Sequence, residues 1–246
     1  SITGVQGEGP MRVGIPIADL CAGLFAAQGI MIALLEREQS GKGQWVQSSL
    51  LQSQIFMLDF QAARWLVNKE VAPQAGNNHP TSIPTGVFET SNGHINIASA
   101  GQAIYERFCK AVDADHLITN PDYADGESRS TNRDALNAEI NTIIKQKDSE
   151  SWVDMLNEAG VPCGPIYSID EVFADPQVKH LGAAESVHSP DRDEDIELVA
   201  QSIKLSRTPS RLEVGPPMRG EHTDEVLEEF GYSATQIADF KTRTVI

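Results

Sequence analysis

One acidic residue, Asp19, stands at the start of an otherwise apolar stretch that continues to Leu35. Pro16 precedes it and suits the first turn of a helix, where a missing N–H leaves no hydrogen bond unmade. Unpaired backbone N–H groups in that turn favour a negative charge. A carboxylate held ionised there can act as a covalent nucleophile. It can equally be a residue that only stabilises the helix start, and this segment alone leaves both interpretations open.

The element that must position Asp19 is a long helix, which the sequence predicts over residues 17–37. Small residues recur on one of its faces, so another stretch of backbone can approach closely. Gly41 suits the left-handed cap after the last turn. The apolar run 20–35 is short for a bilayer span, so we expect a buried core helix. A short strand over 44–49 and a second helix over 50–67 follow.

The composition is that of a globular protein, with 40% hydrophobic and 22% charged residues. The net charge of −16 argues against nucleic acid or an anionic membrane as a partner, because both require basic patches. A small anion can still bind to backbone amides at a helix start. Cys21, Cys109 and Cys163 fit neither a metal site nor a disulfide framework. Reduced thiols favour a cytoplasmic protein.

Residues 69–84 are rich in Pro, Gly and Asn and indicate a linker or a functional loop. A β-hairpin is expected next, with strands over 86–90 and 94–98 around an Asn-Gly turn. The charged stretch 191–197 indicates a solvated loop, and 196–205 a strand. The remaining elements are helices, expected over 104–112, 132–145 and 152–159 and, with side-chain caps, from Ser168, Thr223 and Ser233.

This order of elements predicts a middle domain threaded between two parts of an α/β domain. The large domain would comprise residues 1–68 and 191–246, and the small α+β domain, with its linker, residues 69–190. The first four residues provide neither a helix cap nor a strand start. We therefore expect the chain to be the latter part of a longer protein.

Four segments, in this order along the chain, resemble class III CoA transferases, the carnitine and bile-acid CoA-transferase family. They are residues 14–44 with Asp19, residues 161–165 followed by Asp175-Pro176, then Leu181-Gly182, and residues 220–231. The resemblance spans nearly the whole chain. It implies an α/β fold comprising part of a Rossmann-like large domain, a smaller α+β domain and an intertwined homodimer. We expect the family's N-terminal Rossmann-like segment, with its CoA-binding residues, to lie outside this sequence.

The resemblance implies that CoA moves from an acyl-CoA thioester to a free carboxylic acid. In this family the aspartate at the position of Asp19 attacks the thioester and gives a mixed anhydride, which the released CoA thiolate converts to an aspartyl-CoA thioester. A positioned and desolvated carboxylate suits that role. The partners implied are an acyl-CoA, with succinyl-CoA or another dicarboxyl-CoA as the expected donor, and a small carboxylic acid. No tightly bound cofactor is implied.

The resemblance also places the loop 76–84 where related enzymes carry a mobile loop over the active site. Gly76, Asn77, Asn78 and His79 are therefore the candidate substrate-binding residues. His79 can also be an ordinary loop histidine. Formyl-CoA transferases have a run of glycines in this loop, which this chain does not have, so that specificity is not expected.

Two other functions remain open on the sequence. The related α-methylacyl-CoA racemases use an aspartate at this position as an acid or base, together with a histidine from the N-terminal part, and they form no covalent adduct. The third hypothesis is a non-catalytic fragment or an interaction subunit.

Overall fold

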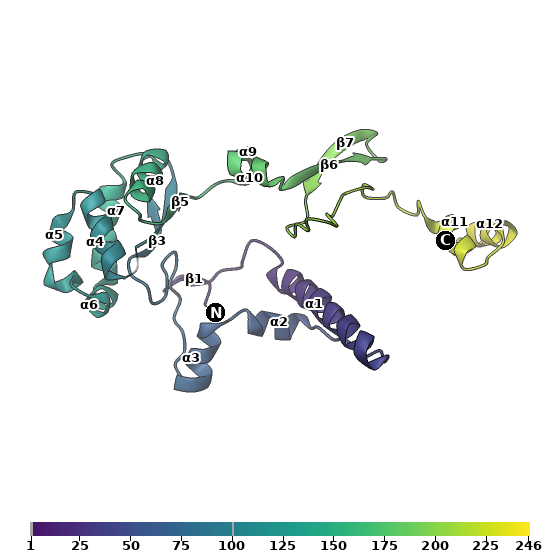
Figure 1. Ribbon diagram of the computed structural model, residues 1–246, viewed down its shortest axis with the longest axis horizontal. Helices are drawn as coiled ribbons and strands as arrows, with labels where there is room; N and C mark the ends of the chain where they lie inside the picture. Colours follow the sequence, from purple (N-terminus) through teal and green to yellow (C-terminus); the bar gives the residue numbers. More distant parts are fainter. Residues whose placement is uncertain (1, 100) are drawn as a thin grey trace. The chain divides into compact units, whose positions relative to one another are not determined.

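The computed structural model describes residues 2–99 and 101–246. The chain divides into two units, Ser1–Ile166 and Tyr167–Ile246 (Figure 1). The first contains β1 (Gly4–Val5), β2 (Gly9–Pro10), α1 (Ile17–Ser40), α2 (Leu50–Phe56), α3 (Phe60–Asn68), β3 (Thr85–Glu89), β4 (His94–Ala98), α4 (Gln102–Ala111), α5 (Asp115–Thr119), η1 (Pro121–Tyr123), α6 (Gly126–Thr131), α7 (Arg133–Ile144), α8 (Ser149–Glu158) and β5 (Cys163–Pro165). The second contains α9 (Ile169–Ala174), α10 (Pro176–Leu181), β6 (Ala184–Ser189), β7 (Glu194–Val199), α11 (Thr223–Glu229) and α12 (Ala234–Thr242). The predicted domain division, with boundaries after residues 68 and 190, remains a prediction.

The hydrophobic core of the first unit lies between residues 83 and 163. Its sheet has the order β3-β4-β5 with antiparallel pairing throughout, so the predicted hairpin over 86–98 is confirmed. Alternate side chains of the sheet point into the core, and α4, α7 and α8 gather around it (Figure 1). The three predicted helices of this region are confirmed within a few residues of their expected ends. The largest fully buried side chains include Ile95, Ile97, Tyr105, Phe108, Leu136, Ile140 and Leu156.

The helix expected over 17–37 is confirmed as α1, which extends to Ser40. Gly41 ends it in the left-handed conformation, with φ 71°, and donates its N–H to the carbonyl of Arg37. Pro16 is the N-cap residue rather than part of the first turn. The prediction that α1 is a buried core helix is wrong within the described residues. Cys21 and Ala22 are its buried residues, because α2 is the main element that packs against it.

Helix α1 is long and apolar enough to cross a membrane by length and composition, because the helix is longer than the apolar run seen in the sequence. A core helix of a soluble protein has the same composition, so this property alone does not distinguish the two. The exposed apolar side chains of α1 include Leu20, Leu24, Ile30, Met31, Ile32, Leu34 and Leu35.

Residues 44–49 lie along the small-residue face of α1, as the close-approach prediction required. The hydroxyl of Ser48 donates to the carbonyl of Ala22 at 2.9 Å. A Cβ atom on Gly29 would lie 2.8 Å from the side chain of Val46. The predicted strand is wrong, because no strand of the described chain pairs with this segment. The helix expected over 50–67 is interrupted between α2 and α3, where Asp59 has φ 49°.

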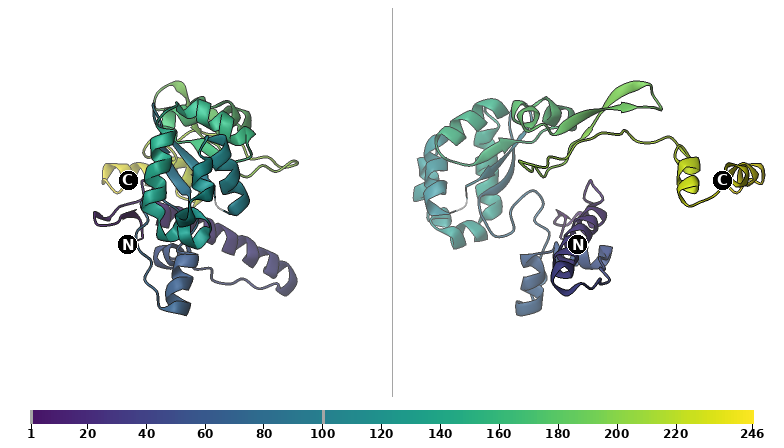
Figure 2. Two further views of the ribbon diagram at one scale, coloured as in Figure 1. Left: turned by 90° about the vertical axis from the view of Figure 1, so that its left-hand side faces the viewer. Right: turned by 45° about the vertical axis from the view of Figure 1, so that its right-hand side comes forward.

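The second unit contains a two-stranded antiparallel sheet, β6–β7, in which Val187 pairs with Ile196. Figure 2 shows it as a ribbon that ends in a tight turn. The solvated loop expected over 191–197 is therefore only partly correct, because Glu194 onward is strand. Pairing with β6, and not the local charge, determines that this segment is a strand. The strand expected over 196–205 begins earlier and ends at Val199.

The predicted helix caps differ in outcome. The capping boxes at Ser168 and Ser233 are confirmed, with Glu171 and Gln236 as their third helical residues. The cap at Thr223 is wrong. His222 holds the cap position without a side-chain hydrogen bond, and Thr223 is the first residue of α11.

Two aspartates are the N-cap residues of helices in the first unit. From their hydrogen bonds we expect the protein to lose stability in acid. Asp125 accepts from the backbone N–H of Ser128 at 2.8 Å, and Asp148 from that of Ser151 at 2.9 Å. These hydrogen bonds hold the pKa of each carboxyl below its usual range. Because the lowered pKa belongs to the folded state, this stabilisation is present above the unfolded pKa and is lost as pH falls through the folded pKa.

Asparagine still caps a helix, so the variant Asp125→Asn/Asp148→Asn removes only the charges. We expect it to be less stable than the wild type near neutral pH, and the gap to narrow at an acidic pH below the usual pKa range of an aspartate carboxyl. Urea unfolding at both pH values measures this. A stability gap that is unchanged in acid would contradict the assignment to charge.

Candidate functional site

Asp19 is the third residue of α1 and the acidic residue of its first turn. This position places the carboxylate near unpaired backbone N–H groups, as the sequence predicts. The side chain is exposed and makes no hydrogen bond or ion pair with any described residue. The sequence led us to expect a desolvated carboxylate at Asp19. The carboxylate is not desolvated in this chain, because side chains next to it on α1, such as Leu20, are exposed as well.

The loop before β3 is attached to its neighbours on two sides. The N–H of Gly76 donates to the carbonyl of Gly4 in β1 at 3.0 Å, and Gly76 has φ 58°, a conformation that suits glycine. Farther along, the N–H of His79 donates to the carbonyl of Thr85 at 2.8 Å, while the carbonyl of Asn77 accepts from Val87 at 3.0 Å. The loop consequently runs beside β3.

His79 has a defined tautomer in this arrangement. Its Nδ1 accepts hydrogen bonds from the backbone N–H groups of Thr81 at 3.2 Å and Ser82 at 3.0 Å. An accepting Nδ1 carries no proton, so Nε2 is the N–H donor of the neutral ring. The ring is stacked against that of Phe60 in α3, with centroids 6.2 Å apart and planes 16° apart. His79 can therefore offer a hydrogen-bond donor from a fixed ring.

The two asparagines differ in what they can offer a ligand. The Oδ1 atom of Asn78 accepts from Nδ2 of Asn137 at 2.8 Å, which commits Asn78 to the packing of the loop. The side chain of Asn77 is exposed and makes no hydrogen bond within the described chain. Asn77 and His79 thus have side-chain groups with unused hydrogen-bonding capacity, and Asn78 has only its Nδ2 amide left.

The structure brings the four loop residues together, but among the described residues no hydrogen bond or ion pair joins them to Asp19. Three residues that shape the loop are not among the residues predicted from the sequence, namely Phe60, Arg133 and Asn137. Arg133 donates to the carbonyl of Pro80 at 2.9 Å. The contacts of Arg133 and Asn137 join residues more than 50 positions apart and leave no local pattern in the sequence. The signal that could have found these two residues is their spacing, because side chains four positions apart share a face of a helix.

A cleft of about 600 Å³ lies at the far end of this loop, with Ser82, Gln102 and Arg129 among its lining residues. Arg129 is only 2% exposed. Its guanidinium donates to the carbonyls of Ile83 and Tyr123 and to the side-chain oxygen of Gln102. The volume is typical of small-molecule sites, and Arg129 supports one wall of the cleft by holding Ile83.

Gly86 in β3 allows the loop to lie close to the strand, because it has no side chain. A Cβ atom there would lie 2.7 Å from the carbonyl oxygen of Asn77 and 3.1 Å from Oδ1 of Asn78. We expect Gly86→Ala to displace the loop and lower the free energy of unfolding by about 1–3 kcal/mol. Gly164 in β5 is the matched control, because a Cβ there meets no atom within 4 Å. Equal urea midpoints for Gly86→Ala and Gly164→Ala would contradict the expectation.

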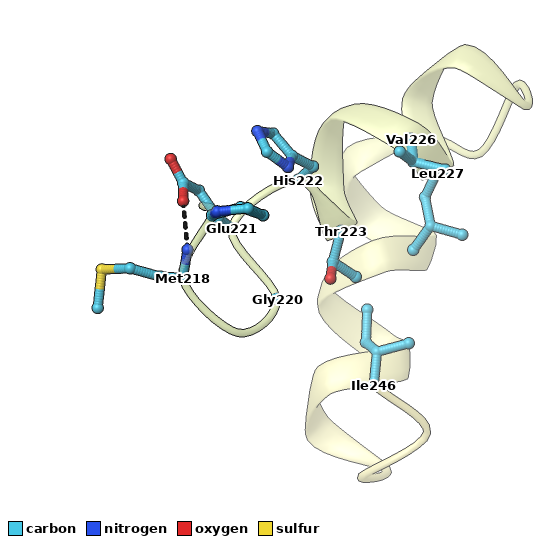
Figure 3. Close-up of a pocket in the computed structure, with 9 residues that line it drawn as sticks. Met218, Gly220, Glu221, His222, Thr223, Val226, Leu227 and Ile246 are labelled. Carbon is cyan, nitrogen blue, oxygen red and sulfur yellow. Dashed lines mark hydrogen bonds between the residues drawn. The ribbon is translucent and has the colours of Figure 1, made fainter. Parts of the chain in front are cut away.

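The segment 220–223 lines a pocket of about 440 Å³ in the second unit. Figure 3 shows Glu221, which accepts from the N–H of Met218 at 2.6 Å, and Thr223, Leu227 and Ile246 on the helical side. None of the predicted site residues lines this pocket.

Cys109 and Cys163 are not activated nucleophiles. All three cysteines are free thiols. Burial raises the pKa of Cys109 to about 11 and also raises the pKa of Cys163, so both remain protonated, weak nucleophiles near neutral pH. In the described part of the chain, no three His, Cys, Asp or Glu side chains are grouped to hold a metal ion.

This chain is similar to CoA-transferases, both in the family model that it matches and in two related proteins. The model of CoA-transferase family III matches residues 1–223. Human succinyl-CoA:glutarate CoA-transferase is 30% identical over 93% of this chain and 52% of its own length. Succinyl-CoA:mesaconate CoA-transferase of Haloarcula hispanica is 32% identical over 94% of this chain and 57% of its own length.

A crystal structure of a CAIB/BAIF family protein from Brucella suis superposes with a TM-score of 0.79 at 27% identity, covering 93% of this chain and 59% of that one. The mixed α/β fold class is confirmed by this match. The chain spans about half the length of the curated relatives named above.

Proposed function

The chain belongs to CoA-transferase family III, and on that premise we propose that it transfers CoA from an acyl-CoA thioester to a free carboxylate. The observation that carries the proposal is the family match over residues 1–223. The names of two relatives specify succinyl-CoA as one substrate and glutarate or mesaconate as the other. A dicarboxyl-CoA donor and a dicarboxylic acid acceptor are therefore the proposed substrates of this chain, and no tightly bound cofactor is needed.

Asp19 is the proposed nucleophile. Its carboxylate oxygen attacks the thioester carbonyl of the donor, the C–S bond breaks, and an acyl-aspartyl anhydride and CoA thiolate result. The thiolate then attacks the aspartyl carbonyl, which releases the donor acid and leaves an aspartyl-CoA thioester. The acceptor carboxylate repeats these two steps in reverse, so that the acceptor leaves as its CoA thioester and Asp19 is restored. No net proton or electron transfer is required. The position of the carboxylate in the first turn of α1, near unpaired backbone N–H groups, supports this role.

The loop residues Gly76, Asn77, Asn78 and His79 are the proposed substrate-binding residues. Nε2–H of His79 and the side-chain amide of Asn77 are donors that can hold a carboxylate or a developing oxyanion. Asn78 and Gly76 support them, because both are engaged in contacts that fix the loop.

A homodimer and a cytoplasmic location are also proposed for this protein. The exposed apolar side chains of α1 need a cover in a water-soluble protein, and a second subunit would provide one. The relatives named above are transferases, so neither favours the racemase alternative.

An exchange assay tests the proposed function. The protein is incubated with succinyl-CoA and a panel of dicarboxylic acids, and CoA esters are separated by chromatography. The proposal requires a new CoA thioester that forms only when a second acid is present. Exchange of the α-hydrogen of a branched acyl-CoA with deuterated water, without transfer, would instead support a racemase. Binding of acyl-CoA with neither reaction would support a non-catalytic role.

A further inference from the structure

A row of polar side chains on α6 and α7 faces the loop that precedes β3. Arg129, Arg133 and Asn137 are four residues apart, so they lie on one face of a helix. Backbone hydrogen bonds from Asn132 to Ser128 and from Leu136 to Asn132 carry the helical pattern across the junction. The spacing therefore presents three side chains to the same neighbour.

Each side chain of this row holds a different position of the loop. Arg129 Nε donates to the carbonyl of Ile83 at 3.2 Å and Arg133 Nη2 to that of Pro80 at 2.9 Å. Asn137 Nδ2 donates to the side chain of Asn78 at 2.8 Å. Contacts at 78, 80 and 83 enclose His79 and the two N–H groups that fix its ring. The opposite side of the loop is bonded to β3.

Two members of the row keep buried polar atoms without a hydrogen bond among the described residues. These atoms are Nε of Arg133 and Oδ1 of Asn137. Leaving a buried polar atom unpaired is unfavourable, so such residues are poor choices for stability alone. Unpaired polar groups that persist in a fold are typical of places where geometry serves function.

We propose that Arg133 and Asn137 are positioning residues for CoA transfer, which fix Asn78 and Pro80 and thereby hold Asn77 and His79 in the geometry that the substrate meets. This inference rests on the proposed transferase function. Neither residue touches the reacting atoms. Their effect is on kcat, because a displaced loop still admits the acyl-CoA but misplaces the donors around the reacting carboxylate.

The chain offers a matched control for Asn137. Asn141 lies one turn farther along the same face of α7 and also makes one long-range hydrogen bond, accepting from the N–H of Glu89 at 2.9 Å. That bond is made to the end of β3 and not to the loop. Asn137→Ala and Asn141→Ala therefore remove the same side chain from the same helix, but only the first releases the loop.

The experiment compares steady-state kinetics and amide hydrogen exchange of these two variants in the full chain. For Asn137→Ala we expect kcat to fall at least about tenfold, with KM for the acyl-CoA changed less than about twofold and faster exchange of the amides of residues 77–83. Arg133→Met is expected to act in the same direction. Arg133→Lys, which can still donate to the carbonyl of Pro80, is expected to recover most of the activity.

Equal kcat values for Asn137→Ala and Asn141→Ala would overturn the positioning role. If the wild type transfers CoA between none of the substrates, the proposed function fails and the positioning role fails with it. Hydrogen exchange then still decides whether the loop is held as described. Faster exchange in Asn137→Ala alone supports the attachment, whereas unchanged exchange excludes it.

Discussion

Replacement of Asp19 by asparagine is expected to lower kcat for CoA transfer by about 10⁴-fold, because residues that form a covalent intermediate have effects of this order. Asparagine has nearly the shape of aspartate and leaves α1 intact, but its amide oxygen is too weak a nucleophile to displace CoA. The carboxylate makes no hydrogen bond or ion pair with any described residue, so its removal breaks no structural contact there. The measurement is the initial rate of transfer at saturating acyl-CoA.

The control is Glu38→Gln, the same chemical change near the other end of α1. It is expected to leave kcat within about twofold of the wild-type value, because a surface substitution away from the site has little effect. Asp19→Asn with kcat near that of the wild type would exclude a covalent role for this residue. Loss of activity in both variants would instead indicate damage to the helix.

Replacement of Phe108 by alanine is expected to be the most destabilising single change in the core of the first unit. Phe108 is fully buried and belongs to the cluster formed by the sheet and helices α4, α7 and α8. Removal of such a ring loses its transfer free energy and leaves a cavity, at a cost of about 3–5 kcal/mol. The helices around this core pack against the sheet. They therefore cannot close the space without moving the sheet. Urea unfolding followed by circular dichroism measures the loss.

Lys110→Ala on the same helix is the control for helix propensity and exposure. Lys110 is exposed, and its replacement is expected to change the free energy of unfolding by less than about 0.5 kcal/mol. A value below about 1 kcal/mol for Phe108→Ala would show that this core does not carry the stability of the unit.

The elements that the sequence predicted well are those fixed by local chemistry. The helix that begins near Asp19, its glycine cap, the hairpin around Asn92-Gly93 and the capping boxes all depend on residues within a few positions of one another. The strand expected over 44–49 was wrong because a strand exists only beside a partner. The β7 strand was only partly recognised for the related reason that its pairing outweighs its charged composition.

The sequence suggests which residues form the candidate site, and that choice stays a prediction, but it does not predict how they are arranged. Asp19 is marked by its place at the start of an apolar helix, and the loop by its composition. The tautomer of His79, the stacking on Phe60 and the attachment of Asn78 to Asn137 come from contacts between distant parts of the chain. The sequence overestimated the burial of α1. Apolar composition shows that a helix has apolar surface to bury, but it does not show which element, if any, covers that surface.

Mass spectrometry of the intact protein after incubation with an acyl-CoA is the most direct test of Asp19 as the covalent nucleophile. Hydroxylamine or borohydride is added to trap an aspartyl thioester or anhydride, and peptide mapping then locates the modified residue. The covalent role predicts a modification on Asp19 that is absent from Asp19→Asn. An unmodified Asp19 in a protein that binds the acyl-CoA and transfers CoA would contradict it.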